Sequence, residues 1–300
     1  MDYLLVFLSV VLLSLGFVMQ KFYQKMNGPD AGISFTIYSG LLSLLTLFLM
    51  NVGTLSFGFS WYSLINAAGK ALCFYLYTIL GFRIMYRGCV ALYMLFLMSG
   101  GMVLPVVWGW LFLDEWEGPS SMLRAIGVLL IILSIALTKS GERKTDKKLI
   151  LPLLGVFFLN GGVSILSKLH QIQDPATVVS TPTYALISGI FSVSISFSVA
   201  LLKQPHPAEA KGDKTKKSFL PKISLKLFGM IVLYSILGCT SNILQLNGAK
   251  NLPASVLYPI ITGGTIVFTG IMALVFFGEK PSRKEWVGIA LCTLSTFLFL

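Results

Sequence analysis

Ten long apolar stretches follow one another along the chain and constrain its fold more than any other feature. A helix needs about 20 apolar residues to cross a hydrocarbon layer of about 30 Å, and a spanning segment has to satisfy its own backbone hydrogen bonds. We therefore expect an all-α integral membrane protein with ten transmembrane helices. The predicted spans cover approximately residues 3–20, 33–51, 61–82, 88–113, 121–139, 149–168, 177–202, 223–247, 253–277 and 284–300.

The composition agrees with this class and excludes others. Of the 300 residues, 55% are hydrophobic and 12% are charged, which is not the balance of a soluble domain. The net charge of +11 comes from Lys and Arg between the apolar stretches, so it indicates membrane orientation and no nucleic-acid partner. The four cysteines lie singly in apolar segments, with no histidine placed to complete a metal site, so we expect no metal and no cofactor.

The chain divides into two similar halves. The first stretch lacks a basic leading segment and a cleavage site, so we expect it to remain as a spanning helix. We expect a first five-helix repeat over residues 1–139, a linker over 140–148 and a second five-helix repeat over 149–300. Within the second repeat, the Lys- and Pro-rich segment 203–222 has almost nothing to bury and predicts a mobile charged linker between the second and third helices.

Matched residues in the same order support the repeat. Lys21 aligns with Lys168 and SFTIY (34–38) with STPTY (180–184), at an offset of 146 or 147; later pairs, such as SGG (99–101) with TGG (262–264), are offset by about 163. Because each half holds an odd number of spans, the second half has to cross the membrane in the opposite sense. Inverted repeats of this kind are characteristic of secondary transporters, which bind substrate near the midplane between the halves.

Basic residues predict the orientation. Of the 23 Lys and Arg, most lie on the side of the connections that follow odd-numbered spans. Only Arg124, Lys168 and Lys250 lie on the other side. The positive-inside rule therefore places the basic loops in the cytoplasm and both termini outside, in a bacterial inner (plasma) membrane.

The two halves resemble the EamA-type transporters of the drug/metabolite transporter superfamily over nearly the whole chain. The resemblance is carried by the five-helix halves, by Lys21 and Lys168, and by the segments 104–137 and 265–300. The family pattern is an apolar helix ending in Gly-Glu, a turn with Pro and a final helix that opens with Gly; the second half matches at Gly278, Glu279, Pro281 and Gly288, whereas the first has Asp114 in place of the Gly. The resemblance implies a ten-helix carrier of small polar or amphipathic metabolites, often an exporter.

Lys70 lies close to the middle of the predicted third span, about 13 Å from either end at 1.5 Å per residue. A charge at that depth costs about 2.5 to 3.5 kcal/mol unless it meets water or a partner, and no Asp or Glu lies inside a predicted span. We expect Lys70 to face an anionic or zwitterionic solute. The alternatives are an uncharged Lys70 bonded to helix carbonyls or tyrosine hydroxyls, or a misplaced helix boundary.

Polar side chains at helical spacing form stripes on four predicted helices. In the family that the chain resembles, helices of these classes line a central cavity. Alternatively, such side chains only hold helices together through interhelical hydrogen bonds. The residues expected to bind substrate are Lys70, Asn66 and Tyr77 on the third helix, Asn160 and Ser164 on the sixth, Tyr234 and Ser241 on the eighth, and Tyr258 and Thr262 on the ninth.

Small residues and prolines mark candidate hinges at matched places in the two halves. Small residues let helices approach closely, and proline frees a backbone carbonyl and bends a helix. These positions are either hinges for a rocking motion or packing sites alone. They are Gly100, Gly101, Pro105, Pro259, Gly263 and Gly264. Tyr38 and Tyr184 are expected in the aromatic belt at the membrane surface, with gates as the alternative.

The sequence thus predicts a secondary transporter that moves a small anionic or zwitterionic metabolite, amino acid-like or phosphorylated, by alternating access, as an exporter. Its expected partners are that small-molecule substrate and the lipid bilayer, and it is a monomer or homodimer. The alternatives are a multidrug or organic cation exporter, a passive channel or receptor-like scaffold, and an integral-membrane transferase. We expect no enzyme, because the acidic cluster 114–117 lacks a matching partner and His170 and His206 are expected in loops.

Overall fold

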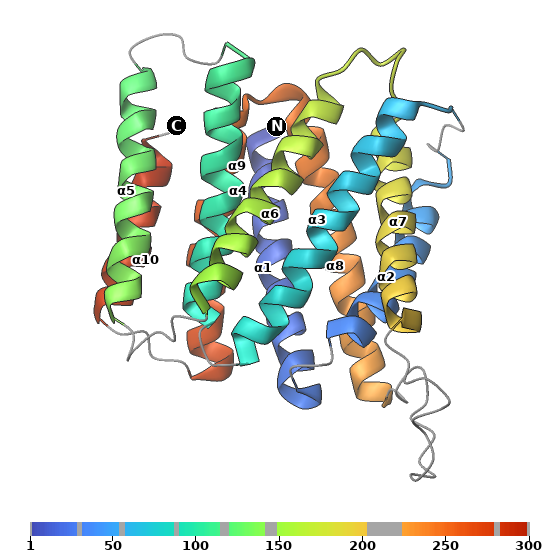
Figure 1. The fold of residues 1–300 in the computed structure, drawn as a ribbon, viewed down its shortest axis with the longest axis horizontal. Coiled ribbons are helices and arrows are strands. Elements are labelled where there is room, and N and C mark those ends of the chain that lie inside the picture. The colour runs from blue at the N-terminus through green and yellow to red at the C-terminus, as the bar shows by residue number, and fades with distance from the viewer. Residues whose placement is uncertain are drawn as a thin grey trace.

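The computed structural model describes residues 2–28, 32–53, 58–86, 90–114, 120–141, 149–202, 224–278 and 283–298. Within these ranges the chain forms ten α-helices and no β-strand (Figure 1). The helices are α1 (Asp2–Asn27), α2 (Gly32–Asn51), α3 (Trp61–Tyr86), α4 (Val90–Phe112), α5 (Ser120–Gly141), α6 (Ile150–Gln171), α7 (Thr181–Leu202), α8 (Leu225–Asn251), α9 (Ala254–Phe277) and α10 (Arg283–Phe297).

Most of these helices are suited to a bilayer. Among the described residues, α1–α4 and α6–α9 are long and apolar enough to cross a membrane, and α10 contributes a shorter apolar segment. Large apolar side chains point outward, including Leu151 at 78% exposure and Leu202 at 84%. Monomeric soluble proteins rarely expose so much apolar surface. The chain is therefore an integral membrane protein.

α6 continues beyond its predicted end, and its last turns make polar contacts with other helices. The Nζ atom of Lys168 donates hydrogen bonds to the carbonyl oxygens of Ala249 (3.2 Å) and Leu252 (2.9 Å), at the end of α8. A cation at this place satisfies carbonyls that lack helical partners and opposes the negative end of the helix dipole. α6 continues to Gln171, so the prediction that His170 lies in a loop was wrong. His170 is buried in the last turn of α6, and its Nε2 lies 3.0 Å from the Oγ of Ser63.

α7 begins later than predicted, at Thr181 rather than 177. The preceding segment is a turn in which the carboxylate of Asp174 accepts the backbone N–H of Ala176 and its carbonyl accepts that of Thr177, both at 2.9 Å. Such local bonds compete with helix formation. The predicted linker 203–222, most of the linker 140–148, and the turn containing Glu279 and Pro281 lie outside the described residues.

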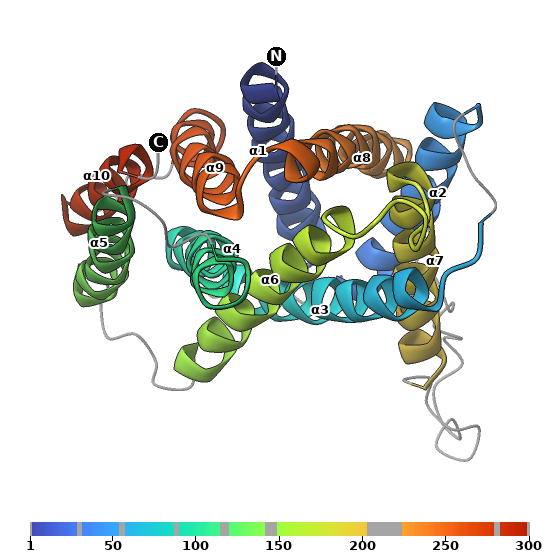
Figure 2. The same cartoon turned by 90° about the horizontal axis from the view of Figure 1, so that it is seen from above.

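The helices pack in a reciprocal pattern. α1 packs on α8 and α9, as α6 packs on α3 and α4; α2 packs on α8, as α7 packs on α3. Three further pairs, α2 with α7, α4 with α9 and α5 with α10, join the corresponding helices of the two sets of five. Exchanging α1–α5 with α6–α10 therefore reproduces the packing. Seen from above, α5 and α10 lie at one edge of the bundle (Figure 2).

Glycines fix the register of α2 against α7. A Cβ atom on Gly40 would lie 2.6 Å from the Cγ2 of Val193, and one on Gly189 would lie 2.8 Å from the Cδ2 of Leu44. Gly189 and Val193 each follow Gly40 and Leu44 by 149 positions. This spacing differs by three residues, or about one helical turn, from the offset of 146 that matches SFTIY with STPTY. Because glycine has no side chain, the hydrophobic pattern of the sequence does not reveal this register.

The candidate hinge residues lie where α4 and α9 meet other helices. A Cβ atom on Gly100 would overlap the carbonyl oxygen of Phe157 in α6, and one on Gly264 would lie 2.9 Å from the Cγ1 of Val10 in α1. Gly101 contacts α6 in the same way, Gly263 is buried in α9, and both helices continue through Pro105 and Pro259. These contacts give the small residues a packing role. Their role as hinges stays a prediction.

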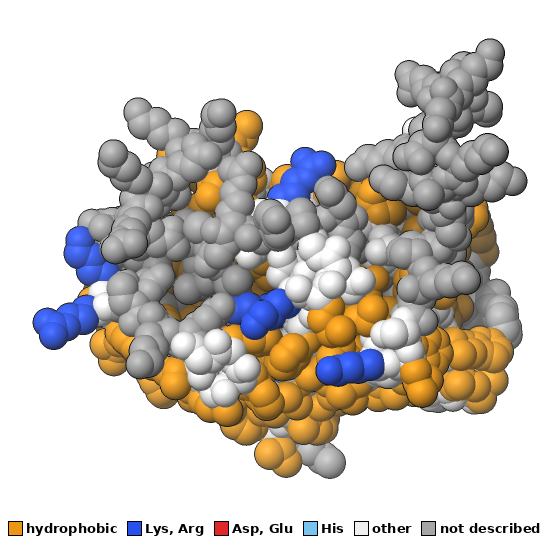
Figure 3. All heavy atoms as spheres, turned by 90° about the horizontal axis from the view of Figure 1, so that it is seen from below, with side chains coloured by type: hydrophobic (Ala, Val, Ile, Leu, Met, Phe, Trp, Pro, Cys, Tyr) orange, Lys and Arg blue, Asp and Glu red, His pale blue; other side chains and the backbone are white. Residues whose placement is uncertain are grey.

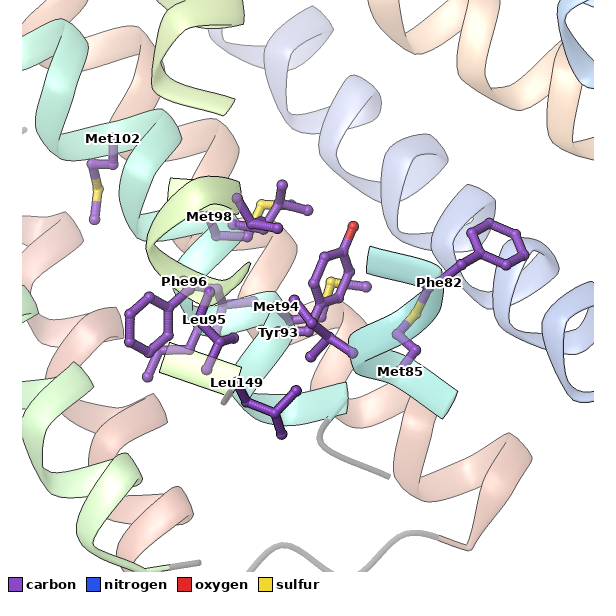
Figure 4. Close-up of a cluster of buried hydrophobic side chains, with 14 of the residues drawn as sticks. Phe82, Met85, Tyr93, Met94, Leu95, Phe96, Met98, Met102 and Leu149 are labelled. Carbon is purple, nitrogen blue, oxygen red and sulfur yellow. The ribbon is translucent and has the colours of Figure 1, made fainter. Parts of the chain in front are cut away.

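Apolar side chains fill both ends of the bundle. We call the end where α1 begins and α10 ends the upper end, and the opposite one the lower end (Figure 1). The largest cluster gathers residues near the lower ends of several helices, among them Tyr23, Phe35, Phe82 and Tyr93. Figure 4 shows its part around Met85, Tyr93 and Leu149. Two smaller clusters lie among the upper ends of α1, α7, α8 and α9.

Replacing Gly100 tests the close packing of α4 on α6. Gly100→Ala forces a methyl group against the Phe157 carbonyl and should destabilise the fold by about 1–3 kcal/mol, as overpacking does. Gly229→Ala is the control, because that exposed position in α8 has nothing within 4 Å. Thermal unfolding of the purified variants in detergent measures the difference. Equal midpoints for both variants would contradict the packing.

Candidate functional site

A cavity of about 270 Å³ lies between the two sets of helices. Its lining residues come from α1–α4 and α6–α9, and none of the described lining residues belongs to α5 or α10. Packed apolar clusters lie toward both ends of these helices, so the cavity occupies the intermediate depth of the bundle. A concave site between the helices of a bundle is one of the places where small ligands bind preferentially.

The two sets of helices contribute equivalent positions to this cavity. On α1 and α6, α2 and α7, and α3 and α8, four lining positions recur at constant offsets of 147, 149 and 164. Three of the twelve matched pairs, all on α2 and α7, carry the same residue, and the other nine differ. The pairs on α1 and α6 are Leu13/Asn160, Gly16/Val163, Phe17/Ser164 and Gln20/Ser167. Those on α2 and α7 are Thr36/Ala185, Ser39/Ser188, Gly40/Gly189 and Ser43/Ser192. Those on α3 and α8 are Lys70/Tyr234, Phe74/Gly238, Tyr77/Ser241 and Thr78/Asn242.

Lys70 gives the cavity its charge. It is 7% exposed, lines the cavity, and its Nζ atom has no hydrogen-bond partner among the described residues. The described lining residues include no Asp, Glu or Arg. Because α3 continues to Tyr86, Lys70 lies about 14 Å from the upper end of the helix and about 24 Å from the lower end, rather than at its middle. An ammonium group buried without an anion is costly, so it favours a ligand that supplies one.

A hydrogen-bonded aromatic cluster lies beside Lys70. Its Nζ lies 5.0 Å from the ring centroid of Tyr184, a cation–π distance. Tyr184 donates from its hydroxyl to the Oδ1 of Asn66 (2.7 Å) and stacks on His170 at 3.7 Å between ring centroids. Tyr184 is fully buried, so the prediction that it belongs to the membrane-surface belt was wrong. The hydroxyl of Ser63 joins His170 to the N–H of Val179 and closes this upper part of the bundle.

Aromatic rings occupy the equivalent positions at the lower end of the cavity. Phe35 lies 4.8 Å from Tyr234, 5.1 Å from Tyr23 and 5.3 Å from Phe82, measured between ring centroids. At the offsets of 164, 149 and 147, Tyr234, Phe35 and Tyr23 correspond to Lys70, Tyr184 and His170. One end of the cavity is therefore cationic and hydrogen-bonded, whereas the other is aromatic.

All the predicted binding residues except Asn66 line the cavity. Asn66 is held by Tyr184 behind Lys70. Some lining polar groups already have protein partners: the Nδ2 of Asn160 donates to the carbonyl of Leu97 (2.7 Å), and the hydroxyl of Tyr258 donates to the carbonyl of Ser164 (2.6 Å). Ser241 also donates to the carbonyl of Ser9 in α1 (2.8 Å), so these three contacts fit the interhelical alternative. Thr262 instead donates to the carbonyl of Tyr258 within its own helix (2.7 Å). Tyr77 and Tyr234 line the cavity beside the apolar cluster. Substrate binding by these residues stays a prediction.

The polar lining of α1, α2 and α7 was missed from the sequence. It includes Gln20, the pair Ser39 and Ser43, and the pair Ser188 and Ser192. Each serine pair is spaced by four residues, which is the signal that could have identified it. No group of three or more His, Cys, Asp or Glu in the described part of the chain is placed to hold a metal ion.

Comparison with known proteins shows the fold alone. The sequence matches no protein-family model and no curated protein. The structure is similar to solved structures; one of them, a crystal structure, has a TM-score of 0.69 over 99% of this chain and 95% of the other chain, at 11% sequence identity. At that identity the likeness extends to the arrangement of the helices and not to activity.

Two buried lysines should respond oppositely to the same substitution. Lys70→Met removes a partnerless ammonium and should raise the thermal unfolding midpoint of the protein in detergent. Lys168→Met, at an equal exposure of 7%, removes two hydrogen bonds at the end of α8 and should lower stability by about 2 kcal/mol. A lower midpoint for Lys70→Met would show that Lys70 is paired within the protein.

Proposed function

We propose that the chain is a secondary transporter that moves a small anionic or zwitterionic metabolite across the membrane by alternating access, as an exporter of the EamA type. The observation that carries this proposal is the cavity at intermediate depth whose one charged side chain among the described lining residues, Lys70, has no hydrogen-bond partner among them. A substrate carboxylate or phosphate would supply the missing anion. Export is the direction that the resemblance to EamA-type transporters implies.

The packing supports two inverted five-helix repeats. Exchanging α1–α5 with α6–α10 reproduces the contacts, and the cavity receives matched positions from both sets. α1 and α6 run in opposite directions, as Figure 1 shows. In transporters built this way, rocking of one repeat against the other exposes a fixed central site to each side in turn. Close glycine contacts, such as those of Gly40 and Gly189, let helices of the two repeats pack closely against one another.

The proposed cycle opens the two ends of the cavity in turn. Toward the upper end, opening would break the contacts of Tyr184 with Asn66 and of His170 with Ser63. Toward the lower end, it would separate the aromatic rings around Phe35. Lys70 holds the substrate anion between these two closures. A proton antiport of cations would need an acidic side chain in the cavity, and the described lining residues include none.

An organic cation exporter is a second candidate. Aromatic rings that line the cavity, such as Phe17, Phe74 and Tyr77, attract cations through their faces. The ammonium of Lys70 opposes this, because two like charges in one poorly hydrated cavity repel strongly. We therefore place anion transport first.

Charge at the lower end supports the proposed orientation in a bacterial plasma membrane. Figure 3 shows this face from below, with Lys and Arg side chains around it and no Asp or Glu in view among the described residues. Lys25, Arg83, Lys226, Arg283 and Lys284 belong to the helix ends at this side. Positive charge is retained in the cytoplasm, so the lower end would be cytoplasmic and both termini outside.

Counterflow in proteoliposomes tests the function. Internal unlabelled substrate should stimulate saturable uptake of the labelled anion, which neither a channel nor a transferase would show. Lys70→Met should weaken substrate binding by at least about tenfold, because truncating one partner of a buried charge pair costs about 2–5 kcal/mol. Lys250→Met, the loss of an exposed lysine, should leave transport unchanged. Full counterflow in Lys70→Met would remove Lys70 from the site.

Cysteine labelling tests the orientation. In a variant without the native cysteines, Asp174→Cys lies in the exposed turn at the upper end, and Lys226→Cys lies at the exposed lower end of α8. A membrane-impermeant maleimide added to intact cells should label Asp174→Cys and reach Lys226→Cys only after permeabilisation. The reverse result would invert the topology.

A further inference from the structure

The charge, shape and size of the cavity together define a substrate class narrower than anionic or zwitterionic metabolites. We infer that the substrate is a monovalent carboxylate that carries one aromatic ring and no ammonium group. This inference rests on the proposed transport function. It depends on three observations: the one charge on the described lining, the row of side chains below Lys70 and the cavity volume.

The charge of the lining limits the charge of the ligand. One carboxylate neutralises the single ammonium of Lys70, whereas a phosphate ester with two negative charges would leave one of them buried and unpaired. An α-amino acid would bring its own ammonium next to that of Lys70. The described lining residues contain no Asp or Glu to receive it, so it would be unpaired and repelled.

The row of side chains below Lys70 indicates what the rest of the ligand is. Phe74 and Tyr77 follow Lys70 by four and seven residues, so all three lie on one face of α3, and all three line the cavity. At 1.5 Å per residue their Cα atoms lie about 6 and about 10 Å below that of Lys70. The two rings meet edge to face, with centroids 5.1 Å apart. Phe17 lines the cavity from α1. A carboxylate on Lys70 would thus place a ring joined by a short chain among these aromatic side chains.

The volume of the cavity accommodates a ligand with one ring. The cavity of about 270 Å³ is less than twice the ~150 Å³ of an apolar cavity that holds benzene. This leaves room for a ring with a short acidic side chain. A short aliphatic acid would leave the aromatic part of the cavity without contact, and its affinity would fall with the buried apolar area.

A series of ligands with a common ring tests the inference on the purified full-length protein. The probes are 3-phenylpropionate, its neutral amide, phenylalanine, 3-phenylpropylamine, phenyl phosphate and the ringless propionate. Isothermal titration calorimetry measures each affinity. We expect 3-phenylpropionate to bind at least about tenfold tighter than every other probe, a difference of about 1.4 kcal/mol.

Variants connect that preference to the named residues. Lys70→Met should reduce the affinity for 3-phenylpropionate to that for the amide, and Phe74→Ala should weaken binding of 3-phenylpropionate while leaving that of propionate unchanged. Lys250→Met is the matched control and should bind as the wild type does. A sharp thermal unfolding transition confirms that each variant is folded.

The outcomes separate this inference from the proposed function. If phenylalanine or phenyl phosphate binds as tightly as 3-phenylpropionate and depends on Lys70, the inferred class is wrong and anion transport stands. If 3-phenylpropionate binds through Lys70 but shows no counterflow in proteoliposomes, the inferred ligand class stands and the transport function is wrong. Undetectable binding of 3-phenylpropionate, or binding that Lys70→Met leaves unchanged, overturns the inference.

Discussion

The desolvation of a single ammonium group is the constraint on which the rest of this site depends. Burying an ammonium group in an apolar interior has a high free-energy cost, and Lys70 is buried without a hydrogen-bond partner among the described residues. A nearby carboxylate would remove that cost and also the affinity for an external anion. The ring of Tyr184 gives a weaker contact that an anion can replace. The site therefore holds an unfavourable charge that a bound anion would relieve.

The repeated packing explains how one cavity can have two different ends. Equivalent positions from both sets of helices surround it, and the side chains differ at most of those positions. Lys70, Tyr184 and His170 make a polar upper part, and the matching Tyr234, Phe35 and Tyr23 make an aromatic lower part. The same helix geometry thus provides closures that differ in chemistry. A carrier with ends of this kind can bind one orientation of an asymmetric substrate.

The elements that the sequence predicted well are those set by local properties. Apolar length located the helices, and helical spacing brought Lys70, Tyr77 and Tyr234 to one cavity. The elements it did not predict depend on contacts between helices. The hydrophobic pattern of α2 does not reveal that Gly40 packs on Val193. His170 is buried because it contacts Ser63 of α3 and Tyr184 of α7, which are distant in the sequence. Lys168 likewise donates to carbonyls more than 80 positions away in the sequence.

The central claim is that the ammonium of Lys70 faces a hydrated cavity between two inverted repeats. An electron cryomicroscopy structure in lipid nanodiscs, at a resolution that shows ordered water, tests it most directly. The account predicts water or ligand density within hydrogen-bond distance of the Lys70 Nζ, and a twofold axis in the membrane plane that relates the two sets of helices. A Nζ atom that points at lipid, or that is bonded only to protein groups in a dry interior, would contradict it.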